Sequence, residues 1–406
     1  MSKADSTDNF FRSEGLLPQE EFLEVRNKSN SYIVGIPKES DPNERRVLVT
    51  PQGTEELVNQ GHRVFVQSGA GKSSNYSDLD YSDYGAEIVQ TIDEIFTNAD
   101  IILNIKPYSL KTIKKLRGNQ LIFSSLQDVE NIKEYVSILM EKKITAIAPE
   151  KIKDKHNNSP VISSMSEIAG KVAIFIAAEL LSNTRGGKGV LLGNITGITP
   201  PEIIVFGAGK AAETAIKTAL AIGATIKVFD KSIYRLQELQ NKIGRCIYTS
   251  VLQKQVIEKE LLSADVVIGA MHNLNENPEF ILSNEMVKTM KEGSVIIDLS
   301  IDKGGFVEGS RPTTLTNPTY INNGVIHYNV PNVASQVSRT ASISLSNIFI
   351  PLITQIANCC SFNNAIKADL GLRKGIYVFN GILTDSHIGL KTGIQSRDIE
   401  LLMAAF

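Results

Sequence analysis

The sequence predicts an α/β protein built from two doubly wound Rossmann-like domains that flank a cleft. Its 406 residues suffice for two domains of ordinary size. Short apolar runs alternate with helix-like segments, which is typical of parallel sheets with helical crossovers. The alternation restarts after a long apolar helix, and the second series opens with a glycine-rich turn.

The composition excludes several classes of protein. Hydrophobic residues make up 42% and charged residues 21% of the chain, as in ordinary soluble proteins. The net charge is −2, from 42 Lys and Arg against 44 Asp and Glu, so we expect no nucleic-acid partner. The N-terminus is polar, and Val172–Ala178, the longest apolar run, is far shorter than the ~20 residues of a membrane helix. These features predict a cytoplasmic protein without a membrane partner.

The cysteines and histidines indicate neither a disulfide scaffold nor a metal site. Cys246, Cys359 and Cys360 lack a Cys-x-x-Cys spacing. The five histidines form no ligand cluster in the sequence. We therefore expect no metal.

The first domain begins with a buried strand, predicted at Tyr32–Ile36. Pro51–Gln60 predicts a helix, because Pro opens it, acidic residues follow and Gly61 ends it. His62–Gln67 alternates between apolar and polar residues, as a strand does. Further apolar runs predict three more strands, at Asp100–Ile105, Leu121–Ser125 and Ile144–Ala148.

The second series follows a predicted buried helix at Glu167–Leu181. Its six expected strands match the count of a dinucleotide-binding sheet. They are Ile203–Phe206, Thr225–Phe229, Arg245–Tyr248, Val266–Ala270, Val295–Leu299 and Val325–Tyr328. Ile343–Ala357 then predicts a helix that returns to the first domain. The substrate domain is accordingly expected to be discontinuous, with residues 1–160 and 339–406, and the cofactor domain to span 161–338.

The glycine-rich turn has the spacing Gly207-x-Gly209-x-x-Ala212 between a strand and a helix. Gly207 allows a sharp turn, Gly209 allows the backbone to approach a pyrophosphate at the helix N-terminus, and Ala212 allows close helix–strand packing. Asp230 ends the next strand, about 20 residues further on, where a carboxylate binds both ribose hydroxyls. A carboxylate repels a 2′-phosphate, so the motif favours NAD over NADP.

Several side chains at strand ends are candidates for chemistry. Lys106 ends a strand of the first domain, and Arg46 precedes the strand-like Val47–Thr50; both cations suit a substrate carboxylate. Asp302 follows the fifth strand of the second series, whereas Asp298, inside that strand, is expected to be structural.

Several strings together resemble the alanine dehydrogenase family and, more distantly, the NAD-binding component of proton-translocating nicotinamide nucleotide transhydrogenase. They are GIPKESDPNERRVLVTPQG, GHRVFVQSGAG, SMSEIAG, VFGAGKAA, DLSIDKGG and EGSRPTT, and the resemblance runs from about Tyr32 to Ala357. The resemblance implies reversible oxidative deamination of L-alanine to pyruvate and ammonium, with hydride transfer to NAD. It also implies a homo-oligomer, as a hexamer.

The resemblance assigns roles to individual residues. Arg46 and Lys106 are expected to hold the substrate carboxylate and carbonyl, and Asp302 to lie beside the nicotinamide and the reacting carbon. In addition to the glycine-rich turn and Asp230, the cofactor is expected to contact Ser166, Arg235, Ala270, Met271, Asp302, Asn332 and Val333.

Gln127 departs from the family, because it occupies the position of the family's acid/base histidine. An amide can hydrogen-bond a carbonyl but cannot carry a proton at neutral pH. Either Asp302 or Lys106 takes the proton role, or His272 supplies it from the loop after the fourth strand. Alternatively the substrate has changed, or the protein is an NAD-binding sensor or interaction module without dehydrogenase activity.

Overall fold

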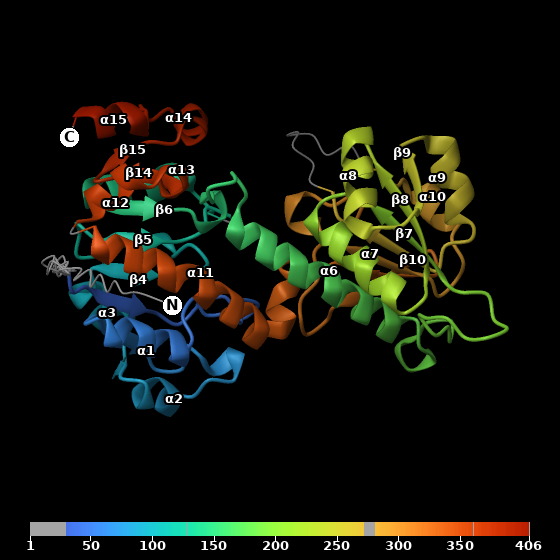
Figure 1. Cartoon of the computed structure of the whole chain (residues 1–406), viewed down its shortest axis with the longest axis horizontal. Helices are drawn as coiled ribbons and strands as arrows, with labels where there is room; N and C mark the ends of the chain where they lie inside the picture. Colours follow the sequence, from blue (N-terminus) through green and yellow to red (C-terminus); the bar gives the residue numbers. More distant parts are fainter. Residues whose placement is uncertain (1–29, 128, 272–280, 360, 406) are drawn as a thin grey trace, which may run out of the picture.

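The computed structural model describes residues 30–127, 129–271, 281–359 and 361–405. Two separate sheets form two lobes, one at each end of the molecule (Figure 1). Each sheet has an apolar cluster on both faces, because successive strand residues point to opposite sides. In the first sheet Ile101 and Leu103 pack into one cluster and Ile102 into the other. The predicted α/β class with two Rossmann-like lobes is confirmed.

The first sheet has eight strands in the order β15-β14-β6-β5-β4-β1-β2-β3. The strands are β1 (Ile33–Ile36), β2 (Arg63–Gln67), β3 (Glu87–Val89), β4 (Ile101–Leu103), β5 (Leu121–Phe123), β6 (Thr145–Ile147), β14 (Ile376–Phe379) and β15 (Ile382–Leu383). β1 to β6 are parallel and doubly wound, whereas β14 and β15 are antiparallel additions from the C-terminal segment. The sequence did not predict β3, β14 or β15.

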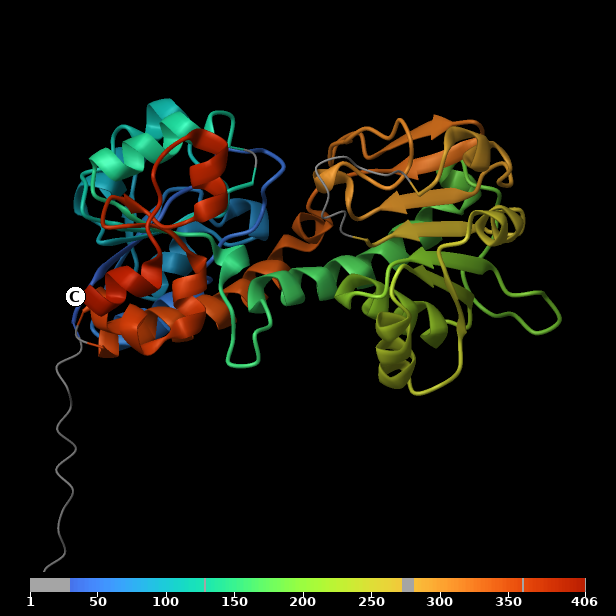
Figure 2. The ribbon, with the colours of Figure 1, turned by 90° about the horizontal axis from the view of Figure 1, so that it is seen from above.

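The helices of this lobe pack on both faces of the sheet (Figures 1 and 2). They are α1 (Pro51–Asn59), α2 (Asp78–Asp83), α3 (Ile92–Asn98), α4 (Leu110–Ile113), α5 (Ile132–Glu141), α12 (Phe362–Ala368), α13 (Leu370–Gly375), α14 (Ser386–Thr392) and α15 (Ile399–Ala405). The expected strand at Val47–Thr50 is wrong. The backbone N–H groups of Val47 and Thr50 donate to the hydroxyls of Ser342 and Ser346 instead of to a neighbouring strand.

The second sheet has seven strands in the order β12-β13-β11-β10-β7-β8-β9. They are β7 (Glu202–Phe206), β8 (Thr225–Asp230), β9 (Tyr248–Val251), β10 (Val266–Gly269), β11 (Val295–Asp298), β12 (Thr319–Asn322) and β13 (Val325–Tyr328), with helices α7 (Lys210–Ala221), α8 (Ile233–Ile243), α9 (Lys254–Leu261) and α10 (Asn284–Lys288). The six parallel strands have the expected dinucleotide-binding order.

Two details of this sheet differ from the sequence-based expectation. The third strand is Tyr248–Val251, not Arg245–Tyr248, because α8 ends at Gly244 in the left-handed conformation (φ 75°) and the next residues form a connection. β12 is an additional antiparallel strand. Its turn to β13 is formed by Asn323 and Gly324, both at positive φ (53° and 76°), as tight hairpins require.

Two long helices, α6 (Pro160–Leu180) and α11 (Ser338–Asn358), run between the lobes (Figures 1 and 2). α6 begins at Pro160, earlier than the predicted Glu167, because proline fits the first position of a helix. α11 is the expected returning helix and contains Pro351. The predicted domain boundaries fall at the starts of these two helices and stay a prediction.

Both connecting helices are apolar enough to pass a length-and-composition test for membrane spans. Pro160–Leu180 has a mean hydropathy of 1.6 and Val333–Asn358 of 1.3, with 33% and 50% of the most apolar windows buried. Connecting helices that pack between two lobes meet the same test. The expectation of no membrane partner stays a prediction.

Candidate active site

Arg46 and Glu44 form a buried ion pair in the loop after β1. Nε of Arg46 donates to Oε1 of Glu44 at 2.8 Å and Nη2 to Oε2 at 2.6 Å. The two side chains are 10% and 0% exposed, so Arg46 is not the solvated surface cation that a charged run usually contains. Burial alone would raise the pKa of Glu44, but the charge and hydrogen bonds of Arg46 bring that pKa below its usual value.

Glu44 connects the first lobe to the segment before α11. The Ser335 hydroxyl donates to Oε1 at 3.0 Å and the Asn332 amide to Oε2 at 3.0 Å. Asn332 has a left-handed backbone (φ 56°) and precedes a short 3₁₀ helix, Val333–Val337, whose first residue is buried. Arg46, a predicted substrate-binding residue, and Asn332, a predicted cofactor-binding residue, therefore both donate hydrogen bonds to the Glu44 carboxylate.

Lys106 lies at the carboxyl end of β4, partly buried, next to a second acidic residue. Glu39 accepts hydrogen bonds from the backbone N–H groups of Ile105 at 2.6 Å and Lys106 at 3.3 Å. Burial, and then the negative charge of Glu44, raises the pKa of Glu39 to about 8, although its backbone hydrogen bonds and Arg46 act in the opposite direction. Two neighbouring carboxyl groups thus differ in proton affinity.

Gln127 lies in an exposed turn after β5. Its backbone N–H donates to the Ser125 hydroxyl at 3.1 Å, and that hydroxyl donates to Glu150 at 3.0 Å. The turn therefore lies at the same sheet edge as Lys106, since the Ser125 N–H donates to the Ile105 carbonyl at 3.0 Å. His272, the alternative proton carrier, lies outside the described residues.

Asp302 lies just beyond β11, as expected, and is exposed in a 3₁₀ turn, Ile301–Lys303. Asp298 is buried and accepts hydrogen bonds from the backbone and hydroxyl of Ser300, both at 2.9 Å, and from the Phe306 backbone at 3.1 Å. Burial raises the pKa of Asp298 to about 6. These contacts support the interpretation of Asp298 as a structural carboxylate, which stays a prediction.

The glycine-rich turn has the geometry that a dinucleotide requires. Gly207 has φ 113°, and a Cβ there would lie 2.5 Å from the Ala270 carbonyl oxygen and 3.0 Å from the Met271 side chain. Gly209 is the N-cap of α7. Among the residues that the structure describes, no side chain caps the helix there, and a Cβ on Gly209 would meet no atom within 4 Å. The first N–H groups of α7 are therefore available to an anion. Ala212 is fully buried, as close helix packing requires.

Asp230 ends β8 and is almost completely buried. Its carboxylate accepts from the N–H groups of Ala208 and Ser232, both at 2.8 Å. Each oxygen retains a further lone pair for a ribose hydroxyl. A pocket of about 590 Å³ adjoins this strand end and is lined by Lys231, Val251, Leu252, Lys254, Ile257, Ile281, Ser283 and Met286. Apolar and polar side chains both line this pocket, which begins at Lys231, the residue after Asp230.

Two further predicted cofactor residues lie on α8 and α6. Arg235 is exposed in the first turn of α8, where its backbone N–H donates to the N-capping Ser232 hydroxyl at 3.3 Å. Ser166 is partly buried on α6. Their roles stay predictions.

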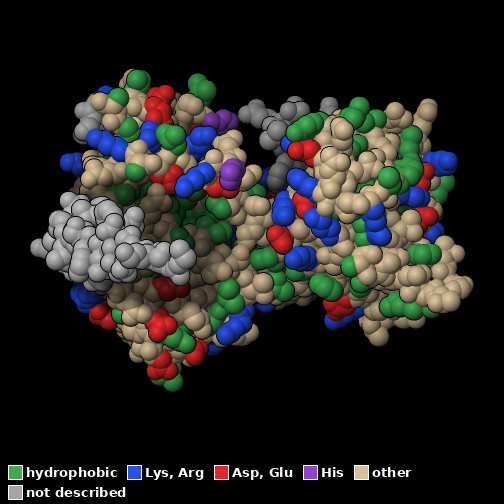
Figure 3. Space-filling model, viewed as in Figure 1, with side chains coloured by type: hydrophobic (Ala, Val, Ile, Leu, Met, Phe, Trp, Pro, Cys, Tyr) green, Lys and Arg blue, Asp and Glu red, His purple; other side chains and the backbone are tan. Residues whose placement is uncertain are grey.

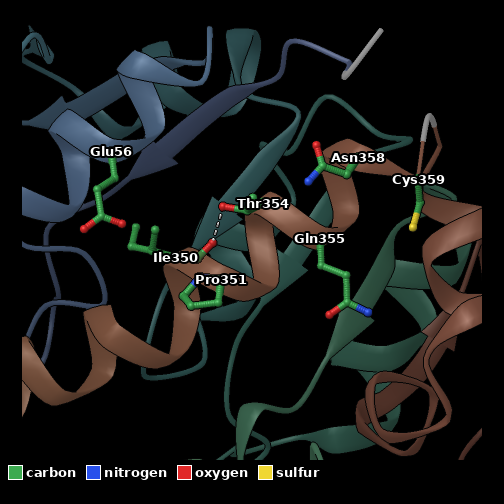
Figure 4. Close-up of a pocket in the computed structure, with 7 residues that line it drawn as sticks. All are labelled: Glu56, Ile350, Pro351, Thr354, Gln355, Asn358 and Cys359. Carbon is green, nitrogen blue, oxygen red and sulfur yellow. Dashed lines mark hydrogen bonds between the residues drawn. The ribbon is translucent and has the colours of Figure 1, made fainter. Parts of the chain in front are cut away.

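A second pocket lies away from these residues, between α1 and the C-terminal half of α11 (Figure 4). It measures about 450 Å³ and is lined by Glu56, Ile350, Pro351, Thr354, Gln355, Asn358 and Cys359. The Thr354 hydroxyl donates to the Ile350 carbonyl at 2.9 Å, within the helix (Figure 4). Pro351 lies roughly 20 Å along α11 from its first residue, so this pocket is separate from the ion pair at the helix start.

The structure gives the positions of possible metal ligands and of cysteines for the described part of the chain. Within residues 30–127, 129–271, 281–359 and 361–405, three or more His, Cys, Asp or Glu side chains nowhere gather as a metal site. Cys246 and Cys359 are free thiols, and Cys360 lies outside the described residues. Basic and acidic side chains are interspersed over the face of both lobes in Figure 3, in keeping with the small net charge.

Sequence reasoning missed two site residues, Glu39 and Glu44. Glu44 lies two residues before Arg46 in the same string. This spacing could have identified Glu44 as the carboxylate that orients Arg46. Glu39 follows a predicted buried strand, the position where ligand-binding residues gather in parallel sheets. Its contact with Lys106 joins segments 67 residues apart, and no local pattern reports such a contact.

Comparison with known proteins gives a consistent result for both lobes. Residues 35–169 match the family model "Alanine dehydrogenase/PNT, N-terminal domain", and residues 173–386 match "Alanine dehydrogenase/PNT, C-terminal domain". An alanine dehydrogenase from Methanococcus maripaludis is 36% identical over 353 residues, which cover 87% of this chain and 94% of that protein. One from Mycobacterium tuberculosis is 34% identical over 361 residues, covering 89% and 97%.

Solved structures agree with this assignment. An L-alanine dehydrogenase superposes with a TM-score of 0.80 at 31% identity, over 88% of this chain and 98% of that one. A transhydrogenase from Sinorhizobium meliloti superposes with a TM-score of 0.73 at 25% identity, over 87% and 99%. With two matching lobes, an oriented arginine and a dinucleotide-type turn, the chain belongs to the alanine dehydrogenase/PNT family.

Proposed function

We propose that this protein is an NAD-dependent alanine dehydrogenase. It converts L-alanine, NAD⁺ and water into pyruvate, ammonium, NADH and a proton, and the reverse. Membership of the family and the names of its relatives support the activity. The structural observation that carries the proposal is the orientation of Arg46 by Glu44.

A guanidinium has two edges, each of which can bind a carboxylate with two hydrogen bonds. Glu44 binds the edge formed by Nε and Nη2 of Arg46. Within the described part of the chain Nη1 donates no hydrogen bond, so the edge formed by Nη1 and Nη2 is available to a substrate carboxylate. Alanine and pyruvate both carry that carboxylate, and Lys106, at the end of β4, supplies a cation for the adjacent carbonyl or imine.

The residues around the glycine-rich turn fit NAD. Gly207, Gly209 and the N-terminus of α7 would hold the pyrophosphate, and Asp230 the adenosine ribose. When bound, NAD⁺ supplies the hydride acceptor for the substrate Cα. Asp230 disfavours a 2′-phosphate through charge repulsion, which supports NAD as the preferred cofactor. The hydrogen bond from Asn332 to Glu44 connects the cofactor lobe to Arg46, the residue that binds the substrate carboxylate.

The test is NADH absorbance with alanine plus NAD⁺ and with pyruvate plus ammonium and NADH, comparing wild type with Arg46→Lys. Lysine keeps the charge but loses the two-bond geometry, so we expect kcat/KM to fall about 100-fold or more. Arg63→Lys is the matched control, because Arg63 makes an equivalent two-bond pair with Glu87 at 2.8 and 2.9 Å on the exposed surface. Equal activity of Arg46→Lys and wild type would refute the assigned role.

A second candidate is an NAD-binding sensor or interaction module of the same fold. The observation in its favour is the exposed amide of Gln127, which cannot carry a proton. This alternative predicts NADH binding by calorimetry without turnover of any amino or keto acid. A screen of amino and keto acids with both forms of the cofactor separates the two proposals, and the oligomeric state stays a prediction.

A further inference from the structure

Glu39 is an acidic residue at the substrate end of the first sheet that the residues assigned above leave without a role. It lies in the loop after β1, and β1 pairs in parallel with β4. The carboxyl ends of both strands therefore lie at one edge of the sheet. The backbone N–H groups of Ile105 and Lys106 hold the Glu39 carboxyl group at that edge.

The groups around Glu39 control its proton. Glu44 and Arg46 face it from its own loop, with opposite effects on its ionisation. Tyr108 faces it from the segment after β4 and interacts with its charge. The Tyr108 hydroxyl is buried and hydrogen-bonds to none of the residues that the structure describes. With burial as the largest cause, the pKa of Glu39 lies near 8, close to the range in which a group both accepts and donates protons.

Arg46 relates Glu39 to the reacting carbon. In a 2-amino or 2-keto acid, the reacting carbon is bonded directly to the carboxylate carbon. A substrate carboxylate bound to the Nη1/Nη2 edge of Arg46 therefore holds the reacting carbon close to the groups around Arg46. Lys106 supplies the cation for the carbonyl or imine at that carbon, and its backbone N–H donates to the Glu39 carboxyl group at 3.3 Å, so Glu39 lies beside the same reacting group.

We propose that Glu39 is the general base that accepts a proton from the water that hydrolyses the substrate imine, and the acid that returns it to the leaving nitrogen. The inference rests on the proposed alanine dehydrogenase function. Hydride transfer from the neutral amine leaves a protonated imine. The water O–H bond breaks and its proton goes to the Glu39 carboxylate, while the water oxygen bonds to the carbon of this protonated imine. The electron pair of the C=N double bond moves to nitrogen.

The second half of the sequence restores Glu39. Its proton passes to the amine nitrogen, and the C–N bond breaks with its electron pair on nitrogen. The hydroxyl proton leaves with the ammonia as ammonium, and pyruvate is formed. Atoms and charge balance without a further reactant. The Gln127 amide takes no part in these proton transfers.

Both directions of the reaction begin with Glu39 as the carboxylate. Deamination begins with the carboxylate, so its kcat is expected to rise as the pH increases through about 8. Reductive amination reverses the same steps and also begins with the carboxylate, which takes a proton from the attacking nitrogen, so its kcat is expected to rise over the same range. A residue that merely supported the Lys106 segment would produce neither limb.

The experiment compares wild type with Glu39→Gln, Glu39→Asp and Asp100→Asn. We expect Glu39→Gln to lower kcat in both directions by about 100-fold or more, to abolish both limbs and to leave the NADH dissociation constant within about threefold. Glu39→Asp retains a titrating limb. Asp100→Asn is the matched control: Asp100 accepts from the Ile33 N–H at 3.0 Å, joining the same two strands at their amino ends, and its kcat is expected to stay within threefold.

Two further readouts separate the possible failures. In difference infrared spectra, the C=O stretch of a protonated carboxyl group should titrate near the kinetic limb in wild type and be missing from Glu39→Gln. Mixing Glu39→Gln with alanine and NAD⁺ should give a burst of NADH equal to the active sites, because hydride transfer then precedes a slow hydrolysis. Wild-type kcat and limbs in Glu39→Gln, or an unchanged infrared titration, would overturn the role of Glu39. A wild-type protein that turns over no amino acid would instead refute the proposed function, and the base assignment with it.

Discussion

Replacing Glu39 by Gln should change how the stability of the protein depends on pH. Folding raises the pKa of Glu39 from its usual 4.5 to about 8, so between these values the folded state binds more protons at this site than the unfolded chain. Wild-type stability therefore includes a contribution that is complete below about pH 4.5 and is lost as the pH rises through about 8. Gln has no proton to lose, and the variant lacks this dependence.

The size of the effect follows from the shift. At about 1.4 kcal/mol for each tenfold change in proton affinity, the displacement corresponds to at most about 5 kcal/mol. We expect about 2 kcal/mol, because water entry and local relaxation reduce the cost of the buried charge. Urea unfolding at a series of pH values from about 5 to 9 measures it as the difference between the two proteins at each pH, which cancels other titrating groups such as Asp298. Unfolding curves that keep a constant offset over this range would refute the reasoning.

Three other changes give independent tests. Gln127→His should keep or raise the activity and add a limb near neutrality, since an imidazole titrates at about 6.5; a pH profile identical to wild type would contradict this. Asp230→Gly should improve the kcat/KM ratio of NADP over NAD by at least about tenfold, because the repulsive carboxylate is removed, and an unchanged ratio would place 2′-phosphate exclusion elsewhere. Gly170→Val should lower the melting temperature, at a cost of about 1–3 kcal/mol or more, because a Cβ there would collide with the Ala211 carbonyl and the Thr214 hydroxyl across the α6–α7 contact; an unchanged melting temperature would show that this contact relaxes freely.

The parts of the fold predicted from sequence are those that local patterns specify. The six parallel strands of the second sheet follow from apolar runs between helical segments, and the turn at Gly207 follows from glycine spacing. β14 and β15 were missed because they lie in the segment after Cys360, beyond the alternation of strands and helices that the sequence shows, and β3 because it has only three residues, one of them Glu87. Val47–Thr50 has the composition of a strand, but its backbone is paired with side chains of α11 almost 300 residues away.

The candidate site divides in the same way. Arg46, Lys106 and Asp302 were located because strand ends and recognisable strings place them, whereas the contacts that set their properties are non-local. The structure shows Arg46 bonded to Glu44 and Glu39 bonded to the Lys106 backbone. It places Gln127 and Asp302 in exposed turns of the two lobes. Only the three-dimensional packing explains why Glu39 and Glu44, five residues apart, have pKa values shifted in opposite directions.

The buried pair of Glu44 and Arg46 is better explained by geometry than by stability. Removing two charges from water costs about as much as their attraction returns, so such a pair adds little net stability. Glu44 nevertheless receives hydrogen bonds from Arg46, Ser335 and Asn332, and these residues come from the substrate lobe and from the segment that leads out of the cofactor lobe. Because these residues share one carboxylate, the edge of Arg46 that binds the substrate has a fixed position relative to the residues beside the cofactor. Hydride transfer requires that relation to be accurate, since reacting atoms must approach to about 3–3.5 Å.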